Sequence, residues 1–286
     1  MKLKKLVAIT LSAVMCMAAL TGCGGKSDSA KKTAKVIEVD LTDEQYAFGV
    51  DKDQPDLLKE VNQFVKDMKS DGTFDEICNR YFGDGTPVPV KSAAYDESKD
   101  QLVVATNAAF EPFEYMDGEN YVGIDMEIAK ALADKLGKEL VIQNMDFDAV
   151  CLSVGQHKCD VAMAGLTIKP DREEYVAFSD PYYSASQKLI TLSTDTEFDA
   201  CKTADDVNKI LEAKGSDLKI GFQNGTTGQF YCEGDDDWGF AGLKMTSTGY
   251  KNGSLAVQDL LNGNLNYVII DSAPAAAITK SLNAMQ

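Results

Sequence analysis

The chain has 286 residues with 28 Lys and Arg, 45 Asp and Glu and one His, so its formal net charge is −17 at pH 7. The excess of acidic side chains argues against a nucleic acid partner. The single histidine argues against a histidine-based catalytic or zinc site, and we expect neither a metal nor another cofactor. The length suits one large domain or two lobes, with a core large enough to fold without disulfide bonds.

The first residues have the pattern of an export signal. A basic stretch, Met1 to Lys5, precedes the apolar run 6–20, and "LTGC" follows. This tetrapeptide resembles a bacterial lipobox, which implies that residues 1–22 are a signal peptide and that Cys23 is lipidated. The alternative is a transmembrane helix, but the run is short for a span and residues 23–35 suit a flexible tether. Two acyl chains would anchor the protein to the outer side of the cytoplasmic membrane, in an extracellular or periplasmic location.

Two amphipathic helices are predicted next. In the first, Pro55 suits the opening turn and the apolar residues up to Met68 follow helical spacing. The second begins at Thr73, which we expect to form a capping box with Glu76, and ends at Gly83. Both helices need another surface to pack on.

From residue 101 onward, strand and helix patterns alternate, which predicts an α/β fold with largely parallel sheets. A break at residues 178–187, rich in small residues and containing Pro181, suits a crossover between two lobes. Two such lobes imply a cleft, and ligands bind at such places. We expect strands at 101–106, 138–143, 160–165, 188–193, 217–222 and 266–271, and helices at 124–136, 149–154, 204–213 and 254–261.

Beyond the lipobox, the cysteines carry little information. Five remain in an odd set without a CxxC pair, which favours buried free thiols, with one disulfide possible in an exported protein. They are Cys78, Cys151, Cys159, Cys201 and Cys232.

Six stretches together carry a resemblance to a known family. They are "ATNAAFEPFEY", "GIDMEIAKALADKLG", "FDAV", "CDVAMAGLTIKPDREEYVAFSDPYY", "IGFQNGTTGQF" and "IIDSAPAA". In this order and spacing they closely resemble the extracellular solute-binding proteins of polar amino acid ABC transporters. The resemblance covers residues 36–83 and 101–286, and it implies the two-lobed type 2 periplasmic-binding-protein fold with a hinged central cleft.

The resemblance implies a carboxylate site made by three residues. Arg172 stands where the family holds the ligand's α-carboxylate, and a guanidinium fork matches a carboxylate bidentately. Thr226 and Thr227 lie in a turn that opens a helix, so the N–H groups there would bind the same anion. An ordinary turn with a threonine cap is the alternative for these two residues.

The ammonium group of the ligand is assigned mainly to Asp271 of the second lobe. The resemblance implies that Asp271, at the end of an apolar strand, pairs with it. Otherwise Asp271 would only cap the helix that begins near Ser272. The hydroxyl of Thr167 and backbone carbonyls near Gly165 would complete the ammonium site.

Aromatic residues would flank the ligand side chain. The resemblance places Phe110 against it and Phe147 as a second wall, although either ring could instead belong to the core. Asn107 occupies a position that is often acidic in the family's basic-amino-acid binders, so its neutrality weakens the case for a cationic ligand, while Glu111 could compensate or face water.

In the family, the strand "NYVIID" and its helix are followed by a "Y-x-F-G-V" strand and by two helices ending in "Y-F-G". Here those last pieces come first, which predicts a circular permutation. The alternatives are a fragment of a tandem duplication and a chain-swapped dimer. The expected parts are residues 36–48 in lobe 2, 49–83 in lobe 1, the linker 84–100, lobe 1 at 101–186 and lobe 2 at 187–286.

The sequence therefore predicts a lipid-anchored receptor, expected to be a monomer, that binds an L-amino acid, with a lean to a neutral polar one, and presents it to an ABC transporter permease. One alternative is an enzyme of the same fold, a dehydratase acting on arogenate or prephenate. Another is a ligand-sensing partner of a signalling receptor.

Overall fold

A computed structural model describes residues 31–286. The predicted signal peptide and Cys23, with the tether up to residue 30, lie outside the described residues. Within the described range, no helix has the length and apolar character needed to cross a membrane.

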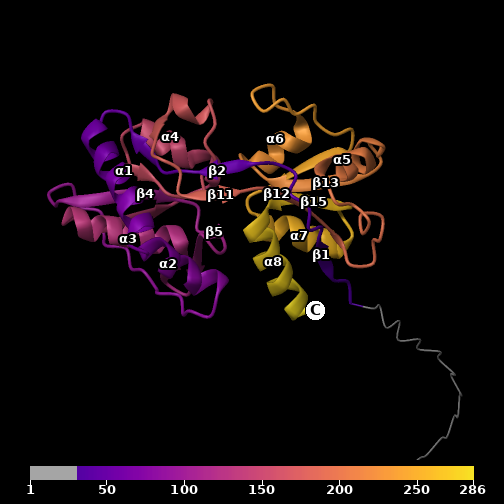
Figure 1. Ribbon diagram of the computed structural model, residues 1–286, viewed down its shortest axis with the longest axis horizontal. Coiled ribbons are helices and arrows are strands. Elements are labelled where there is room, and N and C mark those ends of the chain that lie inside the picture. Colours follow the sequence, from indigo (N-terminus) through magenta and orange to yellow (C-terminus); the bar gives the residue numbers. More distant parts are fainter. Residues whose placement is uncertain (1–30) are drawn as a thin grey trace, which may run out of the picture. The chain divides into compact units, whose positions relative to one another are not determined.

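The first lobe is built on a five-stranded sheet in the order β10-β3-β9-β4-β8 (Figure 1). β4 pairs in parallel with β8 and β9, whereas β3 runs antiparallel to β9 and β10. A small antiparallel sheet, β5-β6-β7, belongs to the same lobe. The strands are β3 (Gly49–Asp51), β4 (Gln101–Thr106), β5 (Ala109–Phe110), β6 (Glu114–Asp117), β7 (Asn120–Val122), β8 (Glu139–Asn144), β9 (Val161–Ala162) and β10 (Val176–Phe178).

The helices of the first lobe come from both parts of the chain. α1 packs on β3 and on α2, and α3 contacts α2, β4 and β8. The elements are α1 (Pro55–Ser70), α2 (Thr73–Phe82), α3 (Ile124–Leu136) and α4 (Val150–Gly155), with the 3-10 turns η1 (Phe147–Ala149) and η2 (Arg172–Glu174). The two predicted early helices thus pack on a lobe whose other strands follow them in sequence.

The second lobe contains the sheet β1-β12-β15-β13-β14 (Figure 1). β13 is parallel to β14 and β15, whereas β12 runs antiparallel to β15 on one side and to β1 on the other. Its elements are β1 (Ala34–Val36), β12 (Gln187–Leu192), β13 (Lys219–Gln223), β14 (Thr246–Tyr250), β15 (Tyr267–Asp271), α5 (Ala204–Glu212), α6 (Thr227–Glu233), α7 (Gly253–Asn262) and α8 (Ser272–Met285).

The chain passes between the two sheets twice, and the two passages are paired. β2 (Glu44–Tyr46) lies between β1 and β3 in sequence, and β11 (Tyr183–Ala185) lies between β10 and β12. These two strands form an antiparallel ladder in which Tyr46 opposes Tyr183. We call this ladder the crossover.

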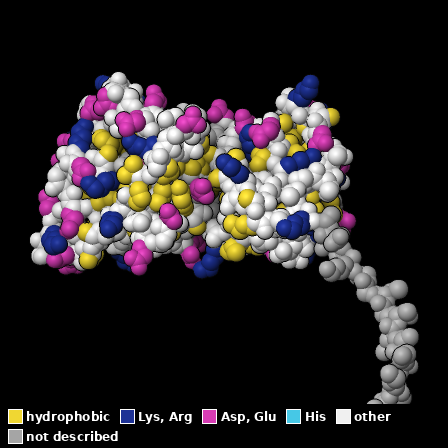
Figure 2. Space-filling view, turned by 90° about the horizontal axis from the view of Figure 1, so that it is seen from below, with side chains coloured by type: hydrophobic (Ala, Val, Ile, Leu, Met, Phe, Trp, Pro, Cys, Tyr) yellow, Lys and Arg dark blue, Asp and Glu magenta, His cyan; other side chains and the backbone are white. Residues whose placement is uncertain are grey.

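Residues 84–100 lie along the first lobe. Val90 and Tyr121 exchange two backbone hydrogen bonds, of 2.7 and 2.9 Å, and the Ala93 amide donates to the Leu140 carbonyl. Figure 2 shows the face on which α2 and α8 lie in Figure 1, and hydrophobic side chains gather on its first-lobe half.

The α/β prediction is confirmed, but both sheets are mixed rather than largely parallel. The predicted capping box at Thr73 was wrong. Thr73 is the first residue of α2, Gly72 with φ 87° is the N-cap, and the Asp71 carboxylate accepts the Thr73 N–H at 2.9 Å. The five cysteines within residues 31–286 are free thiols.

His157 ties the β3–α1 junction to the loop after α4. Its Nδ1 lies 2.8 Å from an oxygen of Asp51, whose side chain is 4% exposed, and its Nε2 lies 3.5 Å from Asp53. The Asp51 hydrogen bond, and then its charge, raise the pKa of His157 above the usual value. Protonated His157 is therefore favoured by folding.

We predict that His157→Asn removes part of the pH dependence of stability. The raised folded pKa means that the His157 contribution is complete below about pH 6.5 and is lost as pH rises through the folded pKa. Asn tolerates the left-handed backbone, φ 58°, found at His157. Melting temperatures between pH 5.5 and 8.5 should show a larger loss in the variant at the acidic end; parallel curves would contradict the assignment.

Candidate functional site

Arg172 lies where the two lobes touch. Its Nη1 donates to the Thr167 carbonyl at 2.6 Å, and its Nη2 crosses to the Gly225 carbonyl of the second lobe at 2.8 Å. The guanidinium carbon is 5.3 Å from the centre of the Phe147 ring. Arg172 is 8% exposed, and no carboxylate of the described chain forms an ion pair with it. Its positive charge is thus buried without an acidic partner.

Asp271 presents the opposite charge at the end of β15. It is 4% exposed, and its Oδ1 accepts a hydrogen bond from the Tyr46 hydroxyl at 2.5 Å. It does not cap α8 with its side chain, contrary to the alternative for this residue. Burial, and then the charge of Glu44, raise the pKa of Asp271 to about 7. A neighbouring cation would lower that pKa again.

Glu44 adds a second buried carboxylate beside Asp271. Its Oε1 accepts from the Gln187 amide at 3.0 Å, and its Oε2 accepts from the Thr167 hydroxyl at 2.8 Å. Glu44 is 2% exposed, and among residues 31–286 neither it nor Asp271 has a Lys or Arg partner. We call Glu44 and Asp271 the acidic floor of the site. The hydrogen bonds to these two carboxylates come from neutral donors.

Asn107 makes one further contact between the lobes and one within the first lobe. Its amide oxygen accepts from Gln223 at 3.2 Å, and its Nδ2 donates to the Met145 carbonyl at 2.7 Å. The Gln223 Oε1 is buried without a hydrogen-bond partner. Thr226 directs its hydroxyl to the Gln223 carbonyl at 2.8 Å, and Thr227 is the first residue of α6, 2% exposed.

Phe110 packs on Gly165. A Cβ on Gly165 would lie 3.0 Å from Phe110 Cε1 and 3.3 Å from the Tyr46 ring, and Gly165 has φ 54°. Its N–H donates to Asp125 at 2.9 Å. A side chain at this position would collide with the ring and strain the backbone, so glycine fits the close approach.

The predicted residues thus fall into two groups. Arg172, Phe147 and the Gly225–Thr227 turn lie at one edge, whereas Thr167 binds Glu44, whose charge in turn acts on Asp271. Glu111, in contrast, is exposed, and it precedes a cis proline. A hollow of about 290 Å³ opens beside Arg172, and its lining includes Phe147, Gly225 and Phe230 from the two lobes.

Three site residues were not predicted. Glu44, Tyr46 and Gln187 reach the floor from the crossover and from the first residue of β12. The only available signal was the short strand pattern "EQY", in which Glu44 and Tyr46 would share one face of β2. It does not identify the strand with which β2 pairs.

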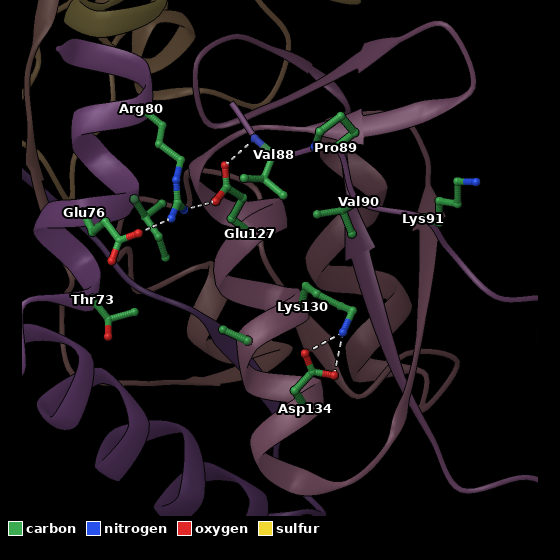
Figure 3. Close-up of a pocket in the computed structure, with 12 residues that line it drawn as sticks. Thr73, Glu76, Arg80, Val88, Pro89, Val90, Lys91, Glu127, Lys130 and Asp134 are labelled. Atoms are coloured by element: carbon green, nitrogen blue, oxygen red, sulfur yellow. Dashed lines mark hydrogen bonds and ion pairs between the residues drawn. The ribbon is translucent and has the colours of Figure 1, made fainter. Parts of the chain in front are cut away.

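A hollow of about 550 Å³ lies elsewhere, between α2, residues 88–91 and α3 (Figure 3). Most of its charged groups are paired with one another: Arg80 binds Glu76 and Glu127, and Lys130 binds Asp134, whereas Lys91 has no ion-pair partner within the described residues. Its apolar wall includes Ile77 and Val90. None of the predicted site residues lines it, so we assign it to the seam between residues 84–100 and the lobe.

Comparisons with known proteins identify the family of the chain. The model of the bacterial extracellular solute-binding proteins, family 3, matches residues 9–84 and 102–278. The arginine-binding extracellular protein ArtP of Bacillus subtilis (strain 168) is 40% identical over 96 residues, which are 34% of this chain and 38% of that protein. The chain thus spans well under two thirds of this curated relative's length.

Solved structures give the fold. An ancestral arginine-binding protein bound to arginine is 34% identical with a TM-score of 0.53, covering 64% of this chain and 75% of that one. The ancestral amino acid-binding protein AncCDT-1, titled a precursor of cyclohexadienyl dehydratase, is 28% identical with a TM-score of 0.53, covering 74% and 78%. The fold is therefore that of the type 2 periplasmic amino acid-binding proteins.

Glu114 is a further buried carboxylic acid of the described chain, and it lies close enough to Asp271 for the two charges to interact. It is fully buried, and neither carboxylate oxygen has a hydrogen-bond partner. Burial, and then the charges of Asp125 and Asp271, raise the pKa of Glu114 well above its usual value. An acid whose folded pKa is raised holds its proton more tightly when folded, so stability falls as pH rises above the unfolded pKa.

We predict that Glu114→Gln stabilises the protein at alkaline pH. The amide keeps the shape and cannot ionise, so the gain in melting temperature should be near zero at pH 5 and should grow toward pH 9. Denaturation curves at four pH values measure this. The exposed Glu111→Gln is the matched control, and an equal response of both variants would contradict the burial argument.

Proposed function

Because the chain belongs to the bacterial extracellular solute-binding proteins, family 3, we propose that it is a receptor that binds a polar L-amino acid between its lobes and delivers it to an ABC transporter permease. On this proposal it lies outside the cytoplasmic membrane, anchored through lipid on Cys23. It acts as a binding protein rather than an enzyme.

One observation carries the proposal: the unpaired buried charges are complementary to a zwitterion. Arg172 has no acidic partner, and Glu44 and Asp271 have no basic one, within the described chain. Buried charges without partners are costly. An α-carboxylate at Arg172 and an α-ammonium group at Asp271 would supply both counterions. Asn107, Phe110 and the Thr226–Thr227 turn would then surround the rest of the ligand.

The side chain of the ligand is open between two expectations. Asn107 favours a neutral ligand, whereas several relatives, including the ArtP protein, are named arginine-binding proteins, which favours arginine. The acidic floor is consistent with either, because the ammonium group alone already needs a carboxylate. We therefore retain the class of polar L-amino acids and place arginine and glutamine first in a screen.

The enzyme alternative has a specific neighbour, the AncCDT-1 protein. A dehydratase would need a general acid, and Asp271, with its raised pKa, is the candidate in the cleft. Product formation from arogenate or prephenate would favour this alternative over the receptor.

The receptor proposal predicts a selective thermal shift. Soluble protein covering residues 26–286 would be melted with each common L-amino acid, and ligand at about 100 times Kd adds about 2.7 kcal/mol to the free energy of unfolding.

Arg172→Ala should weaken binding of the selected amino acid by more than about tenfold, because the ligand carboxylate loses its guanidinium partner. Calorimetry checks this, and unchanged affinity would contradict the assignment of Arg172. Absence of any shift would count against the receptor.

We also propose that the chain is circularly permuted relative to its family. Residues 34–51 supply β1, β2 and β3, which pair with strands that follow residue 160. The family model matches in two stretches on either side of residues 85–101. In addition, Asn283 in α8 exchanges two hydrogen bonds, of 2.8 and 2.9 Å, with the backbone of Ala34. A short connection could therefore join α8 to β1.

A reordered chain tests the permutation. Residues 84–286 would be followed by a short Gly-Ser linker and residues 32–83, so that the contacts of residues 84–100 are kept, with residues 32–286 in the original order as control. Equal melting temperatures and equal amino acid affinity are expected, with both proteins monomeric by light scattering. A reordered chain that fails to fold would contradict the proposal, and a dimeric original chain would favour exchange of residues 32–83 between two copies.

A further inference from the structure

Lys169 is a buried cation between the lobes. It lies in the first-lobe segment between β9 and η2, and its side chain is 4% exposed. Its Nζ is 3.0 Å from Asp235 and 3.7 Å from Asp237, both of the second lobe, and 3.1 Å from Asp171 of its own lobe. It also lies 4.5 Å from the centre of the Phe230 ring in α6. The second lobe thus supplies most of its partners.

The partner loop after α6 holds Asp235 in place. The backbones of Asp235 and Phe240 exchange two hydrogen bonds of 2.9 Å. The Trp238 amide donates to Asp235 Oδ1 at 3.1 Å, which leaves Oδ2 for Lys169. Trp238 stacks on Phe240 with ring centres 5.7 Å apart, and Phe240 packs on Tyr231. These contacts hold the Asp235 carboxylate in place beside Lys169.

Burial separates this contact from another ion pair between the lobes. Lys251 and Asp146 also pair across the cleft, at 3.2 Å, but their side chains are 73% and 62% exposed. Exposed pairs contribute little, whereas breaking a buried one leaves a charge without its counterion. If the lobes parted, Lys169 would keep Asp171 and lose Asp235, Asp237 and the Phe230 ring.

We propose that Lys169, Asp235, Asp237 and Phe230 form an electrostatic latch that stabilises the closed arrangement of the lobes and thereby raises ligand affinity without touching the ligand. We call these four residues the latch. Affinity falls in proportion to the population of the binding-competent state, so a contact that favours closure strengthens binding at a distance. The effect on affinity rests on the receptor function proposed above, whereas the effect on closure does not.

Closure is measured first without any amino acid. X-ray scattering should show a larger radius of gyration for Lys169→Met than for the unchanged protein at low salt. In 0.5 M NaCl the unchanged protein should still be more compact than Lys169→Met, because salt screens a buried ion pair much less than an exposed one. The chain's one tryptophan, Trp238, lies in the latch loop, so its emission should shift in parallel. Lys251→Met, the exposed control, should behave like the unchanged protein.

A second variant guards against misfolding. Asp235→Asn keeps an acceptor for the Trp238 amide and removes the charge, so it should reproduce the larger radius of gyration of Lys169→Met. Scattering and emission that are the same in both latch variants and in the unchanged protein, at both salt concentrations, would overturn the proposal.

Affinity is then measured with L-arginine as the probe. Lys169→Met should bind about tenfold more weakly or worse, because the buried Asp235 carboxylate loses its cationic partner, while Lys251→Met should stay within about twofold of the unchanged protein. Equal affinity of Lys169→Met and the unchanged protein would contradict the affinity claim. Failure of the unchanged protein to bind any amino acid would count against the receptor function and leave the scattering result to decide the latch.

Discussion

The crossover is the constraint on which the rest of the structure depends. Within the described chain, both passages between the sheets run side by side as β2 and β11. Tyr46, with no exposed surface, lies in this ladder, and its hydroxyl reaches Asp271 of the second lobe. Glu44 is on the same strand. The strands that connect the lobes therefore also supply the floor of the site, so a change in the charge of the floor acts directly on the connection.

The distribution of buried charge gives the cleft its chemistry. Acidic groups lie on the floor, Arg172 lies at the edge, and Lys169 pairs with the carboxylates of the latch. Only the last of these groups has ionic partners within the described chain. The cost of burying charge is thus met at Lys169 by the protein itself, whereas on the receptor proposal a zwitterionic ligand would offset it at the floor and at Arg172.

The sequence predicted the local features well and the long-range ones less well. Arg172 and Asp271 could be placed because each follows a recognisable pattern, a loop motif and the end of an apolar strand. Glu44 and Lys169 could not, because their roles depend on partners 143 and 66 residues away, Gln187 and Asp235. The capping box failed for a local reason, since Asp71 competes for the Thr73 amide. Mixed sheets were missed because β1 and β3 have only three residues each, and because the pattern that predicts β12 does not give the direction in which it pairs.

The pairing of β1 and β3 also determines the order in which the protein can fold. Ala34 opposes Leu192, and Gly49 opposes Ala162 and Phe178, so the first strands have no partner until more than a hundred further residues have been made. Contacts of such sequence separation form slowly, because a long loop must close first. During synthesis, the apolar faces of α1 and α2 stay exposed until α3 and the sheet have formed. Apolar surface exposed in this way makes an incompletely folded chain prone to aggregation.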